Sequence, residues 1–346
     1  VEKILERNDE EVLKRYEPLV PMFDLMLELS QILRKNRKKR GSIDFDVAET
    51  KIIVDENHKP VEIKPYDRNP ATKIIEDFML AANETVAEDC FWQELPFVYR
   101  THDNPDPDRM RKLAAFINNF GYTIHLKDDE VHPKELQKLL AKLEETPEED
   151  LISRLTLRSM KQAKYTTECT GHFGLAAKYY CHFTSPIRRY PDLQIHRIIK
   201  DVLRGRMNGT REEHYRSILP EVARQSSERE RKADEAERET IKLKKVEYMS
   251  HHLWEEFDGV ISGVTAWGIY VELPNTVEGL VRTASLQGDY FEYNESACAM
   301  VGVHTGKSYA IGQKVKVQVT GADKMTRTID FELVEGIRST EEYGEG

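Results

Sequence analysis

Residues 182–200, HFTSPIRRYPDLQIHRIIK, combine two adjacent arginines with the start of a predicted helix. Pro191 fits the first turn of a helix with apolar residues at helical spacing, and Gly205 is placed to end it. Arg188 and Arg189 then lie at the helix N-terminus, where free backbone N–H groups and the helix dipole favour an anion. A guanidinium adds paired donors that match a phosphate, so the pattern predicts a phosphate site. The alternative is that both arginines are solvated or paired with surface carboxylates.

The composition indicates a soluble chain with two domains. Of its 346 residues 39% are hydrophobic and 32% charged, which allows a sizeable core. No apolar run approaches the roughly 20 residues of a membrane span, and we expect no membrane association. Four scattered cysteines predict neither a zinc site nor a disulfide framework, so a reducing cytoplasm is the expected compartment. The net charge of −10 argues against general attraction of nucleic acid, although a local positive channel would still bind it.

The first 250 residues are predicted to be mainly helical, with two strands at 51–54 and 61–63. Helices are expected over about 9–36, from Asn69-Pro70, from Asp106-Pro107 to Gly121, over 132–146 and 148–161, and over about 212–249. The last of these has a thin apolar face, formed by Val222, Ser226, Ala233, Ala236 and Leu243. The basic block at 34–40 is interpreted either as a solvated helix end or as a set of RNA phosphate contacts.

The remainder of the chain is predicted to be a separate β domain over residues 251–336, followed by a disordered tail at 337–346. Five strand-like runs predict a five-stranded OB-fold barrel; they are 256–264, 268–273, 278–282, 314–319 and 328–333. Val260, Val264 and Val271 are expected in its core. The predicted class of the whole chain is therefore α+β, a largely helical part followed by a barrel.

The stretch from His182 to Leu193 closely resembles the signature of the ribonuclease II/ribonuclease R (RNB) family, with further matches at 157–163 and 171–176. The resemblance covers nearly all of the chain and identifies residues 1–250 as the C-terminal part of an RNB-type catalytic domain. It implies a processive, hydrolytic 3′-to-5′ exoribonuclease that uses Mg²⁺ and releases nucleoside 5′-monophosphates from single-stranded RNA. The family's metal-binding aspartates precede the matched region, so we expect the Mg²⁺ ligands outside this chain and the isolated chain to be inactive.

The resemblance also implies roles for particular residues. Arg188 matches the family's catalytic arginine and would stabilise charge on the phosphorus, with Arg189 as the substrate-binding alternative. Phe45 would stack bases, although the pattern alone favours a core residue, and Glu76 would bind a ribose hydroxyl, although a solvated carboxylate is the simpler interpretation. In the barrel, residues 259–270 resemble the first hairpin of an RNA-binding domain repeated in a large ribosomal protein. This resemblance implies that Trp267 and Tyr270 are exposed stacking platforms.

Two other hypotheses remain open from the sequence. In the first, the chain is a non-catalytic module that binds RNA or another protein. In the second, acidic residues within the chain replace the missing metal ligands; the candidates are Asp44, Asp46 and Asp103. His172, His182 and His196 are interpreted as hydrogen-bonded structural residues and not as general bases, because a metal-activated water makes a side-chain base unnecessary.

Overall fold

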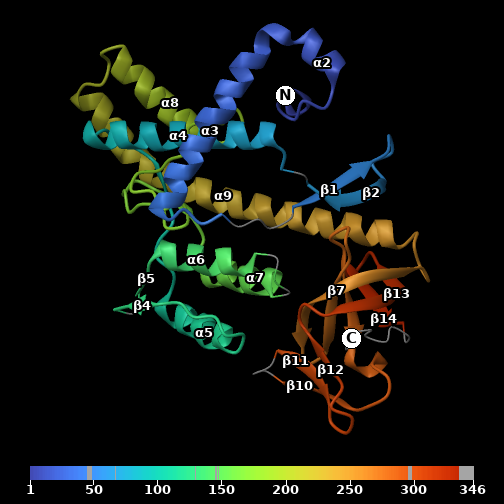
Figure 1. The fold of residues 1–346 in the computed structure, drawn as a ribbon. Helices are drawn as coiled ribbons and strands as arrows, with labels where there is room; N and C mark the ends of the chain where they lie inside the picture. Colours follow the sequence, from blue (N-terminus) through green and yellow to red (C-terminus); the bar gives the residue numbers. More distant parts are fainter. Residues whose placement is uncertain are drawn as a thin grey trace, which may run out of the picture.

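The computed structural model describes residues 1–44, 49–66, 68–128, 130–144, 146, 148–294 and 298–334. Helices fill the half that contains the N-terminus, a β-barrel forms the other end, and the long helix α9 (Gly209–Met249) runs from one to the other (Figure 1). The expected α+β class is confirmed. Phe45, Asp46 and the tail predicted at 337–346 lie outside the described residues. Within the described part of the chain, no helix is both long enough and apolar enough to cross a membrane.

The N-terminal helices differ from the single helix predicted over about 9–36. Two prolines each occupy a first turn, which divides the segment, and α3 continues through the whole basic block to a left-handed Gly41 at φ +109°. The next helix, α4, begins at Pro70 as predicted, and the Asn69 side chain accepts a hydrogen bond from the Thr72 backbone N–H. The bounds are α1 Glu2–Leu5, α2 Glu10–Arg15, a 3₁₀ turn η1 Glu17–Leu19, α3 Val20–Arg40 and α4 Pro70–Trp92.

Buried charge pairs join α3 to α4. Asp77 of α4 is 1% exposed and binds Arg34 at 2.8 Å and Arg37 at 2.5 Å, with a further hydrogen bond from the Ser30 hydroxyl. Burial acts to raise the pKa of Asp77, but these hydrogen bonds outweigh it and hold the pKa below its usual value. Arg40 binds Glu84 at 2.7 Å. The arginines of the basic block therefore hold two helices together, which neither interpretation of the block anticipated.

Small sheets and three helices complete the helical half. The hairpin β1–β2 (Thr50–Val54, Pro60–Pro65) is as predicted, and β3 (Tyr99–Thr101) pairs antiparallel with β6 (Lys164–Thr166). Asp106 caps α5 by accepting from the backbone N–H groups of Asp108 and Arg109, as its sequence predicted. The other elements are α5 Pro107–Asn118, β4 Leu126–Lys127, β5 Glu130–Val131, α6 Pro133–Leu143 and α7 Glu149–Ser159.

The helix α8 (Tyr190–Leu203) packs against the first turns of α9. The apolar face predicted for α9 is wrong in the middle of the helix, because Ala233 and Ala236 are exposed. The buried residues instead gather at its two ends; they are Tyr215, Leu219, Ala223, Val246 and Met249. A helix that crosses between two lobes buries only the ends that touch them, so its middle is polar on all sides.

The barrel has the five strands that the sequence predicted, closed in the order β13-β14-β9-β8-β7. Their bounds are β7 Glu256–Thr265, β8 Gly268–Glu272, β9 Glu278–Arg282, β13 Lys314–Asp323 and β14 Thr328–Leu333. A second sheet was not predicted; it is β10 Phe291–Asn294, β11 Ala299–Gly302 and β12 Ser308–Ala310, with the short turn η2 Thr283–Ser285 before it.

One core prediction in the barrel is wrong. Val264 and Val271 are buried, but Val260 is 37% exposed while its neighbour Ile261 is fully buried. A break in the β7–β8 register between Ile261 and Gly263 shifts the alternation, so that Ile261 and Val264 both face inward.

Candidate RNA-binding and catalytic site

The loop before α8 presents the two arginines that the sequence singled out. The Ser185 carbonyl accepts from the Arg189 backbone N–H at 3.0 Å, which closes a tight turn between them. Arg189 is the N-cap of α8 and Pro191 lies in its first turn. Pro186 and Pro191 fix the backbone φ angle on either side of the two arginines. Both arginine side chains therefore project from a short segment of restricted backbone.

Asp192 binds one of the two arginines, Arg189, and not the other. Its carboxylate is 0% exposed and accepts from the Arg189 Nε at 3.0 Å and Nη2 at 2.7 Å, and from the Ser185 backbone N–H at 2.8 Å. The Arg189 guanidinium is therefore committed to an internal pair. Sequence reasoning did not single out Asp192, although a carboxylate three residues after the N-cap of a helix is a recognisable sign of such a pair.

Arg188 is exposed, and its side chain makes no hydrogen bond or ion pair with any residue that the structure describes. It lines a cavity of about 960 Å³ between the start of α8 and one side of α9, to which Arg189 and Tyr190 also contribute. The α9 side of the cavity carries four carboxylates and one arginine; they are Glu221, Glu230, Asp234, Glu237 and Arg229. Glu221 and Glu230 are paired with Arg224 and Arg100. Among the described residues, Arg188 thus presents a guanidinium without an internal partner, opposite a helix face of mixed charge.

Buried side chains support the chain that leads into this loop. Asn83 of α4 accepts from the Phe183 backbone N–H at 2.9 Å, and the Phe183 carbonyl lies 3.0 Å from the His196 Nε2. The rings of Phe183 and His196 stack with centroids 4.2 Å apart. The loop is therefore fixed from α4 as well as from α8.

The three histidines have the structural roles that the sequence predicted. The Tyr165 hydroxyl lies 2.8 Å from the His182 Nδ1, and the His172 Nδ1 accepts from the Leu175 N–H at 3.2 Å. Burial lowers the pKa of His182 to about 2 and that of His172 to about 3, with neighbouring cations as a further cause. Both imidazoles are therefore neutral at physiological pH, as is usual for buried rings that are hydrogen-bonded within the fold.

Glu76, the predicted ribose contact, already has a partner. Its carboxylate accepts two hydrogen bonds from the Arg68 Nη2, at 2.8 and 3.0 Å, and Arg68 also lies 3.5 Å from Asp44. Glu76 does not line the Arg188 cavity, and the structure leaves its role as a prediction.

The barrel brings its two predicted stacking residues together. Trp267 is 61% exposed in the turn between β7 and β8, and its indole N–H donates to the Tyr270 hydroxyl at 3.1 Å. Tyr270 is half-buried and lines a separate cavity of about 490 Å³ between the barrel and α9. Its ring lies over Gly263, where a side chain would approach it to 3.6 Å.

Among the residues that the structure describes, no group of three or more His, Cys, Asp or Glu side chains could hold a metal ion. Asp103, one of the proposed substitutes, binds Lys164 at 2.8 Å and accepts from the Thr170 hydroxyl. Lys164 is the first cause of the lowered pKa of Asp103, so this carboxylate is paired within the fold.

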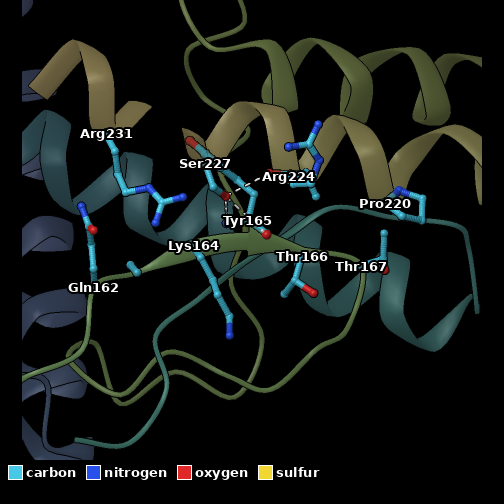
Figure 2. Close-up of a pocket in the computed structure, with 11 residues that line it drawn as sticks. Gln162, Lys164, Tyr165, Thr166, Thr167, Pro220, Arg224, Ser227 and Arg231 are labelled. Carbon is cyan, nitrogen blue, oxygen red and sulfur yellow. Dashed lines mark hydrogen bonds between the residues drawn. The ribbon is translucent and has the colours of Figure 1, made fainter. Parts of the chain in front are cut away.

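A smaller cavity of about 410 Å³ lies on β6 against α9 (Figure 2). Lys164, Arg224 and Arg231 are among the residues that line it, and none of its lining residues is acidic. Arg224 is already paired with carboxylates one turn away in each direction, and Lys164 is paired with Asp103. The Ser227 hydroxyl, which also lines the cavity, accepts from the Tyr165 backbone N–H at 2.9 Å. Two of its three cations are thus neutralised locally.

Comparison with known proteins identifies two sequence families in the chain. The model of the RNB domain matches residues 1–205, and the model of the S1 RNA binding domain matches residues 254–333. Ribonuclease R 1 of Lactococcus lactis is 45% identical, over 94% of this chain and 40% of its own length. Ribonuclease R of Thermotoga maritima is 43% identical, over 94% of this chain and 46% of its own length. The chain thus spans less than half the length of these two relatives.

A solved structure supports the same assignment. Mycoplasma genitalium RNase R, in complex with ribose methylated single-stranded RNA, superposes with a TM-score of 0.84 and 27% identity, over 92% of this chain and 50% of that one. The resemblance to ribonuclease R predicted from the sequence is confirmed. By the match over residues 1–205, the chain belongs to the RNB domain family.

Proposed function

We propose that this chain forms part of a processive exoribonuclease, which hydrolyses single-stranded RNA from the 3′ end and releases nucleoside 5′-monophosphates. The observation that carries the proposal is the difference between two adjacent arginines. Arg189 is held by Asp192, whereas Arg188 is exposed in a cavity of about 960 Å³ without a partner among the described residues. A guanidinium left free in a cavity, in a chain of the RNB family, suits a phosphate of the substrate.

In this proposal Arg188 contacts the scissile phosphate. Hydrolysis adds negative charge to the oxygens around phosphorus, and a planar guanidinium that is already in place stabilises this charge without reorganising. Its contribution is then larger in the transition state than in the bound substrate, which raises turnover more than affinity. Arg189, whose Nε and Nη2 donors are used by Asp192, contributes by its position and stays the alternative substrate-binding residue.

Mg²⁺ is part of the proposed activity, with ligands outside this chain. The described residues do not fit a Mg²⁺ site, since they contain no cluster of three suitable side chains. The residues of this chain therefore act in the proposal only through their contacts with the RNA.

The RNA partner is proposed from the barrel and from two residues of the helical half. Residues 254–333 match the S1 RNA binding domain, and the exposed Trp267 offers a ring face that accepts any base. Phe45 as a stacking residue and Glu76 as a ribose contact remain part of the proposal. We keep the cytoplasm as the predicted compartment.

A second candidate function is RNA binding without hydrolysis. It is favoured by the exposed Trp267 and its partner Tyr270, which are able to bind RNA whether or not the arginine loop acts on it. The two functions differ in their products, so one assay on two proteins separates them.

The test uses a uniformly labelled, unstructured RNA with Mg²⁺, and compares the natural protein that contains residues 1–346 with the isolated chain. We expect the natural protein to release nucleoside 5′-monophosphates and the isolated chain to bind RNA weakly with negligible hydrolysis. If the natural protein binds RNA and releases no nucleotide, the second candidate replaces the first. If the isolated chain hydrolyses RNA at a comparable rate, the prediction of external metal ligands is wrong.

A further inference from the structure

We propose that Asp192 is a positioning residue for Arg188, because its buried carboxylate closes the loop from Ser185 to Arg189 and fixes the backbone that carries the Arg188 side chain. This inference rests on the proposed function. In that function Asp192 does not contact the RNA. Asp192 would act through Arg188, by setting where the free guanidinium lies.

The carboxylate of Asp192 binds both ends of the loop at once. It accepts from the Ser185 backbone N–H at 2.8 Å at one end, and from the Arg189 Nε at 3.0 Å and Nη2 at 2.7 Å at the other. The Ser185 carbonyl in turn accepts from the Arg189 backbone N–H at 3.0 Å. Arg188 lies between these fixed points, so the position of its Cα is set by contacts that its own side chain does not make.

Burial in the fold holds Asp192 itself in place. It belongs to the first turn of α8, and its side chain is 0% exposed. A buried carboxylate without its donors is costly, so the folded chain keeps all three donor atoms, the Ser185 N and the Arg189 Nε and Nη2, bound to it. The upstream part of the loop is fixed separately by Asn83, which accepts from the Phe183 N–H. The loop is therefore fixed on the inside, while the Arg188 side chain is left to line the cavity.

Loss of the Asp192 charge would have two consequences for the cavity. The Ser185-to-Arg189 turn would lose the charged acceptor that ties its ends and would rely on the Ser185–Arg189 backbone hydrogen bond, which lets the Arg188 backbone shift. The Arg189 guanidinium would also be released beside Arg188, at the wall of the same cavity. A displacement of about 1 Å in a group that meets the reacting phosphate is enough for roughly a hundredfold loss of rate.

The test compares Asp192→Asn with a matched control, Asp201→Asn, in the natural protein that contains this chain. Asp201 also lies on α8 and also pairs with an arginine, accepting from the Arg211 Nε at 2.8 Å, but it does not line the Arg188 cavity. For Asp192→Asn we expect single-turnover hydrolysis at saturating protein to fall about 10–100-fold, with the RNA dissociation constant changed less than about twofold. The control is expected to retain the unmodified rate.

A double-mutant cycle separates positioning from general stability. If Asp192 acts through Arg188, then Asp192→Asn has no further effect on the rate in an Arg188→Ala background. Equal loss of rate in both backgrounds would overturn the inference, as would a normal rate in Asp192→Asn. If Asp192→Asn does not fold, Arg189→Lys replaces it, since lysine keeps the charge but loses the two-donor contact with Asp192; the same non-additive loss is expected.

The failure of this inference differs from the failure of the proposed function. If the unmodified protein releases no nucleotides, both are wrong. If it does, and Arg188→Ala is slow while Asp192→Asn equals the Asp201→Asn control, only the positioning role is wrong.

Discussion

The helical half and the barrel are held together by different forces. In the helical half, buried carboxylates bind arginines across elements, as Asp77 does between α4 and α3 and Asp192 does at the start of α8. In the barrel, the interior is apolar, with residues such as Ile261, Val271 and Phe331 almost completely buried. The two halves are therefore sensitive to different changes. Charge pairs respond to pH and to loss of one partner, whereas an apolar core responds to lost volume.

The two candidate functional regions, the Arg188 loop and the Trp267 face of the barrel, differ in the same way. Arg188 depends on a loop that buried polar contacts hold in one geometry, which suits a role in the reaction. Trp267 depends only on exposure of its ring, which suits binding of any base along an RNA strand. We therefore expect changes at the loop to alter rate and changes at the barrel face to alter affinity.

The largest expected effect is on stability in the helical half. Asp77→Ala would leave Arg34 and Arg37 without their buried partner, and removing one member of such a pair costs about 3–5 kcal/mol. Asp24→Ala is the control, because the Arg7–Asp24 pair is about half exposed and such pairs contribute about 0–1 kcal/mol. Urea unfolding of both variants checks this. Equal losses would show that the α3–α4 charge pairs are no stronger than surface pairs.

In the barrel, the expected loss of stability depends on how much buried side-chain volume a substitution removes. Ile261→Ala removes a fully buried side chain and is expected to cost about 2–5 kcal/mol. Val260→Ala changes the adjacent but exposed residue and is expected to lie within about 0.5 kcal/mol of the unmodified protein. Thermal melts of the two variants compare them directly. A larger loss for Val260 would mean that the register break in β7 is misplaced.

RNA affinity is expected to depend on the two aromatic residues of the barrel. Trp267→Ala and Tyr270→Ala should each weaken binding of a homopolymer by about 1–3 kcal/mol, because each removes a ring on which a base stacks. Binding is measured at one fixed salt concentration, together with melting temperature. Unchanged affinity with a lowered melting temperature would assign both rings to packing.

A further expected effect is a pH dependence confined to the helical half. His182 and His172 have pKa values lowered to about 2 and about 3 by burial, so the unfolded chain binds more protons than the folded one below about pH 6.5. Their contribution to stability is complete above about pH 6.5 and falls by about 1.4 kcal/mol per pH unit for each histidine as the pH drops toward the folded values.

This dependence is measured by amide hydrogen exchange, followed separately in the helical half and in the barrel. The two conditions are about pH 7 and about pH 5.5, on either side of the ordinary histidine pKa. We expect the segments around β6 and the arginine loop to lose protection at the lower pH, and the barrel strands to change little. His182→Asn should reduce the dependence without abolishing it, since His172 and His102, whose pKa values burial also lowers, remain. A pH response centred on the barrel would contradict the proposed division between charge pairs and apolar core.

Local sequence signals predicted much of this fold. The helix starts at Asn69-Pro70 and Asp106-Pro107, the end of α8 near Gly205 and the five barrel strands are set by residues near one another in sequence, and all were predicted correctly. The strands β10–β12 were missed because each has only three or four residues.

Contacts between distant residues could not be predicted in the same way. Nothing in the sequence around Arg37 shows that its partner is Asp77, 40 residues later. For the site, spacing identified the arginine pair but could not distinguish Arg188 from Arg189, since both flank the helix start. The family resemblance matched Arg188 to the catalytic arginine, and the structure adds that the Asp192 carboxylate binds Arg189.

The most direct test of the account compares Arg188→Lys with Trp267→Ala in the natural protein, measuring single-turnover hydrolysis at saturating protein and the RNA dissociation constant. Lysine keeps the charge but loses the planar pair of donors. For Arg188→Lys we predict a rate lower by roughly 10²–10³ with nearly unchanged affinity, and for Trp267→Ala weaker binding with a normal rate at saturation. Normal turnover in Arg188→Lys would remove the arginine loop from the reaction and contradict the account.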